Sequence, residues 1–87
     1  MNSEKKMIPV TQLNKHLVTL LQSGVSRGLN SVRLNLIGEV LRKEYDVRPM
    51  NVEVVCFDSG RREECKYIKD SMYNLHSLRG TVVGIKI

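Results

Sequence analysis

One segment decides which fold this 87-residue chain can adopt, because two different periods fit it. Every second position carries an apolar residue or glycine, as a half-buried strand requires: Val32, Leu34, Leu36, Gly38 and Val40. Leu34, Ile37 and Leu41 also recur at helical spacing, so a helix over Asn30–Tyr45 competes with the strand. The fold class follows from this choice.

Gly38 favours the strand. A glycine midway along a long strand permits the sharp bend by which one strand serves both sides of a small barrel. In a helix the same glycine would be a cost. We therefore predict a strand here. If Asn30–Tyr45 is helical instead, the prediction becomes a winged-helix or other helical DNA-binding domain.

The chain before this segment divides into a leader, a helix and a linker. We expect residues 1–8 to be a flexible leader. Thr11 can cap a helix over residues 11–23 that ends before Gly24 and carries four leucines at helical spacing: Leu13, Leu17, Leu20 and Leu21. Ser26–Ser31 is rich in turn-forming residues and predicts a linker into a sheet.

After a charged loop at Arg42–Pro49, the chain is β-rich. Four further strands are predicted, at Val52–Phe57, Glu64–Ile68, Met72–Leu78 and Thr81–Ile87. Asp58–Gly60 and Arg79–Gly80 supply turns between them. The predicted fold class is therefore mainly β. Residues 9–87 form a single domain, a five-stranded OB-fold barrel with an N-terminal helix at 11–23.

Several stretches between Met7 and Ile87 share an order of parts with a known family. MIPVTQLNKHL precedes the predicted barrel, and VRLNLIGEVLRKE covers its first strand. VEVVCFDSGRREECKYI covers the hairpin, and MYNLHSLRGTVVGIKI the last two strands. In these stretches the chain resembles the OB-fold of the replication protein A middle subunit and its telomeric relatives in CST-type complexes.

The resemblance implies a subunit that binds single-stranded DNA or RNA within a heteromeric genome-maintenance or telomere-capping complex of the nucleus. Two parts of the family pattern lack a counterpart. Little room exists between Ile68 and Met72 for the usual helix between strands three and four, and no helix follows Ile87. Because the last helix commonly mediates assembly in the family, assembly by that route is in doubt.

Charge and fold together give the predicted contact residues. The net charge of +5 and the isoelectric point near 9.5 favour polyanionic partners. OB-folds bind nucleic acid across strands two and three and the loops beside them. Cations that would track phosphates and aromatic rings that would stack on bases lie in those regions: Arg42, Lys43, Tyr45, Arg48, Phe57, Arg61, Arg62, Lys66, Tyr67 and Arg79.

A protein-interaction OB module without intrinsic nucleic-acid binding is the alternative. The chain has only three Tyr and one Phe to stack on bases, and acidic residues are interleaved with the cations. Phe57 alternates with Cys56, so one of these two side chains faces the core. The helix face with Leu13, Leu17 and Leu20 would either dock a partner subunit or cover the open end of the barrel.

Other function classes find no support in the sequence. No phosphate-binding loop, HExxH motif or nucleophile elbow is present, so we expect no enzyme and no small-molecule substrate. The residues that could bind a metal lack ligand spacing, so we expect no metal or other cofactor: His16, Cys56, Cys65 and His76. No apolar run is long enough to span a bilayer, so we expect no membrane partner.

Overall fold

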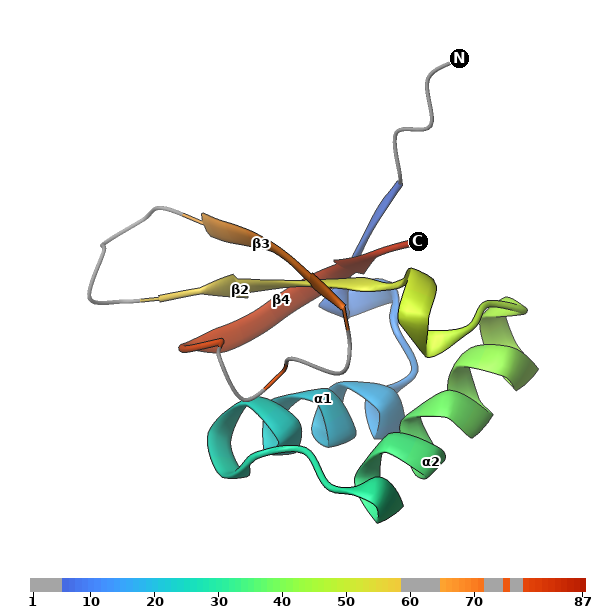
Figure 1. The fold of residues 1–87 in the computed structure, drawn as a ribbon. Coiled ribbons are helices and arrows are strands. Elements are labelled where there is room, and N and C mark those ends of the chain that lie inside the picture. The colour runs from blue at the N-terminus through green and yellow to red at the C-terminus, as the bar shows by residue number, and fades with distance from the viewer. Residues whose placement is uncertain (1–5, 59–64, 72–74, 76–77) are drawn as a thin grey trace.

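The computed structural model describes residues 6–58, 65–71, 75 and 78–87, with 65–71 described by its backbone only. A four-stranded antiparallel sheet in the order β1-β4-β2-β3 lies above two helices (Figure 1). The elements are β1 (Met7–Pro9), α1 (Lys15–Arg27), α2 (Ser31–Val40), β2 (Glu53–Phe57), β3 (Cys65–Ser71) and β4 (Thr81–Lys86). Short helical turns at Val10–Gln12, Leu41–Tyr45 and Pro49–Asn51 are η1, η2 and η3.

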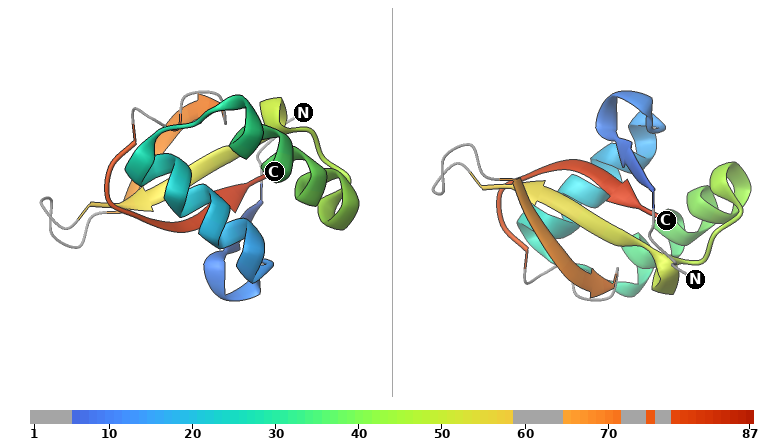
Figure 2. Two further views of the ribbon diagram at one scale, coloured as in Figure 1. Left: turned by 90° about the horizontal axis from the view of Figure 1, so that it is seen from below. Right: turned by 90° about the horizontal axis from the view of Figure 1, so that it is seen from above.

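This architecture overturns the predicted OB-fold barrel. The sheet is open, and α1 and α2 both lie on its lower side (Figure 2). The predicted first strand is helical: α2 continues into the π-helical turn η2, so the competing helix over residues 30–45 is the correct interpretation. The leader prediction is also wrong at its end, because Met7–Pro9 forms β1 and pairs with β4.

The helix α1 forms later in the chain than predicted. Asn14, not Thr11, caps it: the Asn14 side chain accepts from the backbone N–H groups of His16 at 2.8 Å and Leu17 at 3.3 Å. Gly24 does not end the helix but lies buried inside it, where the side chain of Leu75 packs directly on it. The helix ends at Arg27, followed by Gly28 with a φ of +93°.

Ser26–Ser31 does not lead into a sheet but contains the turn between the two helices. Asn30 caps α2 by accepting from the backbone N–H of Arg33 at 2.7 Å. Ile37 and Gly38 are the buried residues of α2. A Cβ on Gly38 would lie 3.3 Å from the Pro49 side chain, so this glycine gives η3 a close approach to the helix and does not bend a strand.

The hairpin prediction is confirmed. β2 pairs antiparallel with β3, and β4 pairs with the other side of β2. The register shifts between Val55 and Cys56. Val55 pairs with Gly84 and Cys56 pairs with Val82, so Val83 is an extra residue in β4 that has no partner in β2. In the segment predicted as a fourth strand, Leu75 and Leu78 belong to no strand and their side chains are buried; residues 72–74, 76 and 77 lie outside the described residues.

The core lies between the lower face of the sheet and the helices. Residues from every layer meet there, including Leu17, Leu21, Ile37, Leu41, Val54, Cys56, Val82 and Ile85. The four leucines of the predicted helix face thus cover a sheet instead of the end of a barrel. Leu13, Leu17 and Leu20 are buried in this core, so none of the three presents a docking surface in this structure.

One side-chain amide joins α1 to the edge of β4. Gln22 Nε2 donates to the Gly80 carbonyl at 3.0 Å, and Gln22 Oε1 accepts from the backbone N–H of Val82 at 2.8 Å. The short strand β1 pairs only with Gly84–Lys86, farther along β4. Gln22 therefore bonds two backbone groups, one just before β4 and one near its start, that β1 does not reach. Neither α1 nor α2 has the length and apolar character that crossing a bilayer requires.

Candidate nucleic-acid interface

The helix α2 is attached to the rest of the molecule along one side only. Ile37 and Gly38 are buried, and Leu41 of η2 continues this buried stripe. On the opposite side, the Val32 side chain is 66% exposed and that of Leu36 is 39% exposed. In both views of Figure 2, α2 projects past the end of the sheet. The helix therefore presents its outer face to solvent.

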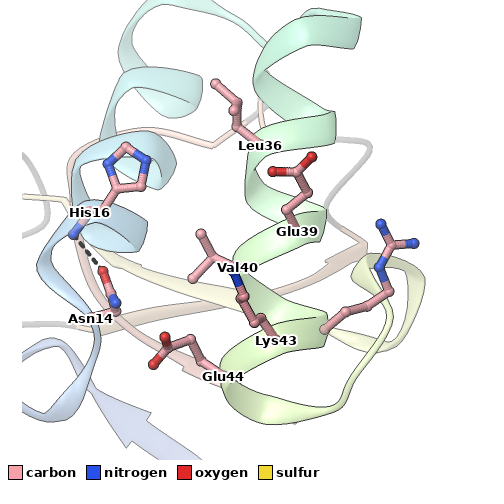
Figure 3. Close-up of a pocket in the computed structure, with 8 residues that line it drawn as sticks. Asn14, His16, Leu36, Glu39, Val40, Lys43 and Glu44 are labelled. Atoms are coloured by element: carbon pink, nitrogen blue, oxygen red, sulfur yellow. Dashed lines mark hydrogen bonds between the residues drawn. The ribbon is translucent and has the colours of Figure 1, made fainter.

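Two hollows flank this outer face. The larger has a volume of about 660 Å³ and lies between the start of α1 and the end of α2 (Figure 3), lined by Asn14, His16, Leu36, Glu39, Val40, Arg42, Lys43 and Glu44. The smaller, of about 300 Å³, lies on the other side of α2, lined by Leu34, Asn35, Gly38, Glu39, Arg42 and Pro49. Because Glu39 and Arg42 line both hollows, they stand on a ridge between them.

We name this ridge, together with its continuation on η2, the outer face of α2. Its exposed residues are Val32, Asn35, Leu36 and Glu39 of α2 and Arg42 and Lys43 of η2. Their spacing of three and four residues places them on one side of a helix. The face combines two apolar side chains, one amide, one carboxylate and two cations. Such a mixture can bind by charge and can also distinguish chemical groups.

A hydrogen bond fixes the end of this face against α1. The backbone N–H of Asn14 donates to the Tyr45 hydroxyl at 3.1 Å. The Asn14 side chain already caps α1, so the same residue connects the start of α1 to the end of η2. At the other end, Arg33 Nη1 donates to the Gly28 carbonyl at 2.6 Å and ties α2 to the turn. The outer face is thus held at both ends.

The charges around the helices are unevenly distributed. No Asp or Glu occurs between Glu4 and Glu39, and neither α1 nor α2 has an acidic residue in its first turn. The partial positive charge at each helix start is therefore not offset by a carboxylate of that turn. Acidic residues appear only toward the end of α2 and beyond, at Glu39, Glu44 and Asp46, among the exposed cations Arg42, Lys43 and Arg48.

The structure separates the sequence-predicted contact residues into two groups. Arg42, Lys43 and Tyr45 lie on η2, and the exposed Arg48 follows shortly after. Phe57 ends β2 and the exposed Arg79 precedes β4, at the opposite end of the sheet (Figure 1). The two groups do not line one groove. Arg61 and Arg62 lie outside the described residues, and Lys66 and Tyr67 belong to β3, described only by its backbone.

The predicted aromatic residues do not form a stacking surface together. The Tyr45 ring packs partly against the core and its hydroxyl accepts from Asn14. Phe57 and Cys56 point to opposite faces: Cys56 is in the core, and Phe57 is half-buried outside it. Tyr45 and Phe57, the two aromatic residues whose side chains the structure describes, lie at different ends of the sheet. Stacking on consecutive bases therefore finds no support in this geometry.

Sequence reasoning missed the exposed residues of α2 itself. In the predicted strand, Val32 and Leu36 would share the apolar face, and Asn35 and Glu39 would lie on the opposite face. The available signal was the spacing of Val32, Leu36, Glu39 and Lys43, which follows a helix of 3.6 residues per turn with Asn30 as its cap.

Comparisons with known protein families, curated proteins and solved structures found no match to this chain.

Proposed function

We propose that this domain binds nucleic acid through the outer face of α2. The observation that carries the proposal is the one-sided attachment of α2, which leaves a helix with exposed Arg42 and Lys43 projecting past the sheet (Figure 2). A helix pair joined by a three-residue turn with a glycine, here Gly28–Asn30, is a frequent DNA-binding arrangement. The net charge of +5 favours a polyanionic partner.

The proposal keeps nucleic acid as the partner but changes the surface. The predicted barrel groove does not exist, so the proposed contact cations are Arg42 and Lys43, and the exposed Arg48 follows them shortly after η2. Membership in a heteromeric nuclear complex, telomeric or otherwise, stays a prediction from the resemblance.

Titration of the domain with fluorescent duplex and single-stranded oligonucleotides, at low and moderate salt, tests the proposal. We expect the double variant Arg42→Ala with Lys43→Ala to bind at least tenfold more weakly. Its log–log salt slope should also be smaller by about 0.9 per lost phosphate contact on duplex. Arg79→Ala removes an exposed cation at the far end of the sheet and is the matched control. Equal losses in both variants would mean that α2 is not the contact surface.

A protein-interaction module is the second candidate. Its specific support is the exposure of Val32 and Leu36, two apolar side chains on the same face of α2. The titration separates the candidates, because a protein-interaction module shows no affinity for any oligonucleotide at low salt. In that case the double variant would bind no differently from the unaltered domain.

A further inference from the structure

The outer face of α2 carries more than phosphate contacts require. Phosphate binding needs cations and hydrogen-bond donors, and it conveys no sequence information. Val32 and Leu36 supply neither, yet they are exposed at the beginning of this face, beside Asn35. Apolar side chains on a surface that binds a polyanion need a different contact.

Base edges in the major groove of DNA offer that contact. The groove is about 12 Å wide and admits an α-helix, whose diameter with side chains is about 10–12 Å. Each A·T pair presents there the N7 and N6 groups of adenine and the C5-methyl group of thymine. An Asn side chain can bond adenine with two hydrogen bonds, and apolar side chains contact the thymine methyl.

We propose that α2 reads base edges in the major groove of duplex DNA. Asn35 hydrogen-bonds an adenine, Val32 and Leu36 contact thymine methyl groups, and Arg42 and Lys43 hold the flanking phosphates. This inference rests on the proposed function and adds the class of nucleic acid and the division of roles among the residues.

Three features of the molecule fit this assignment. Val32, Asn35 and Leu36 lie at three- and four-residue spacing toward the start of α2. No acidic residue precedes Glu39 in α2. The hollows on both sides leave α2 as a ridge, so groove walls can approach it. Arg33 is occupied with the Gly28 carbonyl, so it stabilises the turn instead of reading bases.

Double-stranded RNA and single strands do not fit this assignment. The major groove of A-form RNA is too deep and narrow for side chains to read, and uracil lacks the methyl group. Single strands are bound by stacking on aromatic rings, and the described part of α2 contains none. The inference thus predicts a preference for duplex DNA over both.

The test selects preferred duplexes from a randomised DNA library and then replaces each thymine of the selected site by deoxyuracil. We expect an A·T-containing site, with affinity falling about fourfold for each contacted methyl group removed. In Val32→Ala or Leu36→Ala the same replacement should have little further effect. Asn35→Ala should reduce discrimination at one base pair by about 5- to 150-fold. All three residues are on the exposed side, so folding is not at stake, and circular dichroism verifies this.

The outcomes distinguish the two proposals. Binding that is equal for all sequences, for single strands or for duplex RNA would overturn the reading of bases while leaving nucleic-acid binding intact. Sequence preference that is insensitive to deoxyuracil and to Asn35→Ala would also overturn it. Absence of affinity for any oligonucleotide at low salt would reject both proposals and leave a protein partner for Val32 and Leu36.

Discussion

Two glycines with almost the same backbone angle are under different constraints. Gly28 has a φ of +93° and Gly80 a φ of +94°, a region that other residues rarely adopt. A Cβ on Gly28 would meet nothing within 4 Å, whereas a Cβ on Gly80 would collide with the Phe57 carbonyl oxygen. The pair therefore separates backbone strain from steric conflict.

We expect Gly28→Ala to lower the free energy of unfolding by about 1–3 kcal/mol, the cost of an unfavourable backbone conformation. Gly80→Ala adds the collision and should cost at least about 1 kcal/mol more, because overpacking is itself destabilising by about 1–3 kcal/mol. Urea denaturation of the two variants measures the difference. Equal losses would show that the approach of Gly80 to Phe57 does not constrain the fold.

At the scale of elements, α1 and α2 differ in how they are held. The buried leucines of α1 lie in the core, whereas α2 depends on Ile37, Gly38 and the cap at Asn30. Loss of an N-cap typically costs about 1 kcal/mol. We expect Asn30→Ala to speed hydrogen exchange of the amides in α2 about fivefold while α1 amides keep their protection. Asn14→Ala is the comparison, and uniform loss of protection after Asn30→Ala would contradict separate opening of α2.

Local patterns predicted the elements whose signals are local. The hairpin of β2 and β3 and the strand β4 were predicted from alternating β-branched residues and turn residues such as Gly80. The segment at residues 31–45 was ambiguous because strand and helix periods share Leu34. The helix prevails because Ile37 and Leu41, at helical spacing, are the residues that reach the core. Gly38 was misinterpreted because its neighbour Pro49 is brought close only by the folded chain.

Signals that depend on distant partners could not be predicted from the sequence. The three residues of β1 have no strand pattern of their own and are extended because they pair with β4, at the far end of the chain. The helix α1 begins only after β1 and the turn η1, with Asn14 as its cap. The bulge in β4 likewise places Val82 and Ile85, three residues apart, in the same core. The sequence predicted part of the candidate site. It indicated Arg42 and Lys43 but not the exposed residues of α2, which are Val32, Asn35, Leu36 and Glu39.

For the whole molecule, stability should depend on which side of α2 a side chain occupies. Ile37 is fully buried and its neighbour Leu36 is 39% exposed. We expect Ile37→Ala to lower the free energy of unfolding by about 2–5 kcal/mol. Leu36→Ala should cost less, about 1 kcal/mol, because Leu36 is partly exposed and lies outside the core. Urea unfolding followed by circular dichroism measures both. Similar losses would mean that the buried and exposed sides of α2 are assigned incorrectly.

The amide of Gln22 has a consequence for how copies of the molecule meet. An open strand edge is a template on which another chain can add a strand, and this is a common start of aggregation. Along β4, β1 occupies one stretch of the edge, and the Gln22 side chain occupies the Gly80 carbonyl and the Val82 N–H. A helix side chain thus occupies hydrogen-bonding groups that a strand from another molecule would need. We therefore expect this edge to be a poor site for adding a strand from a second copy.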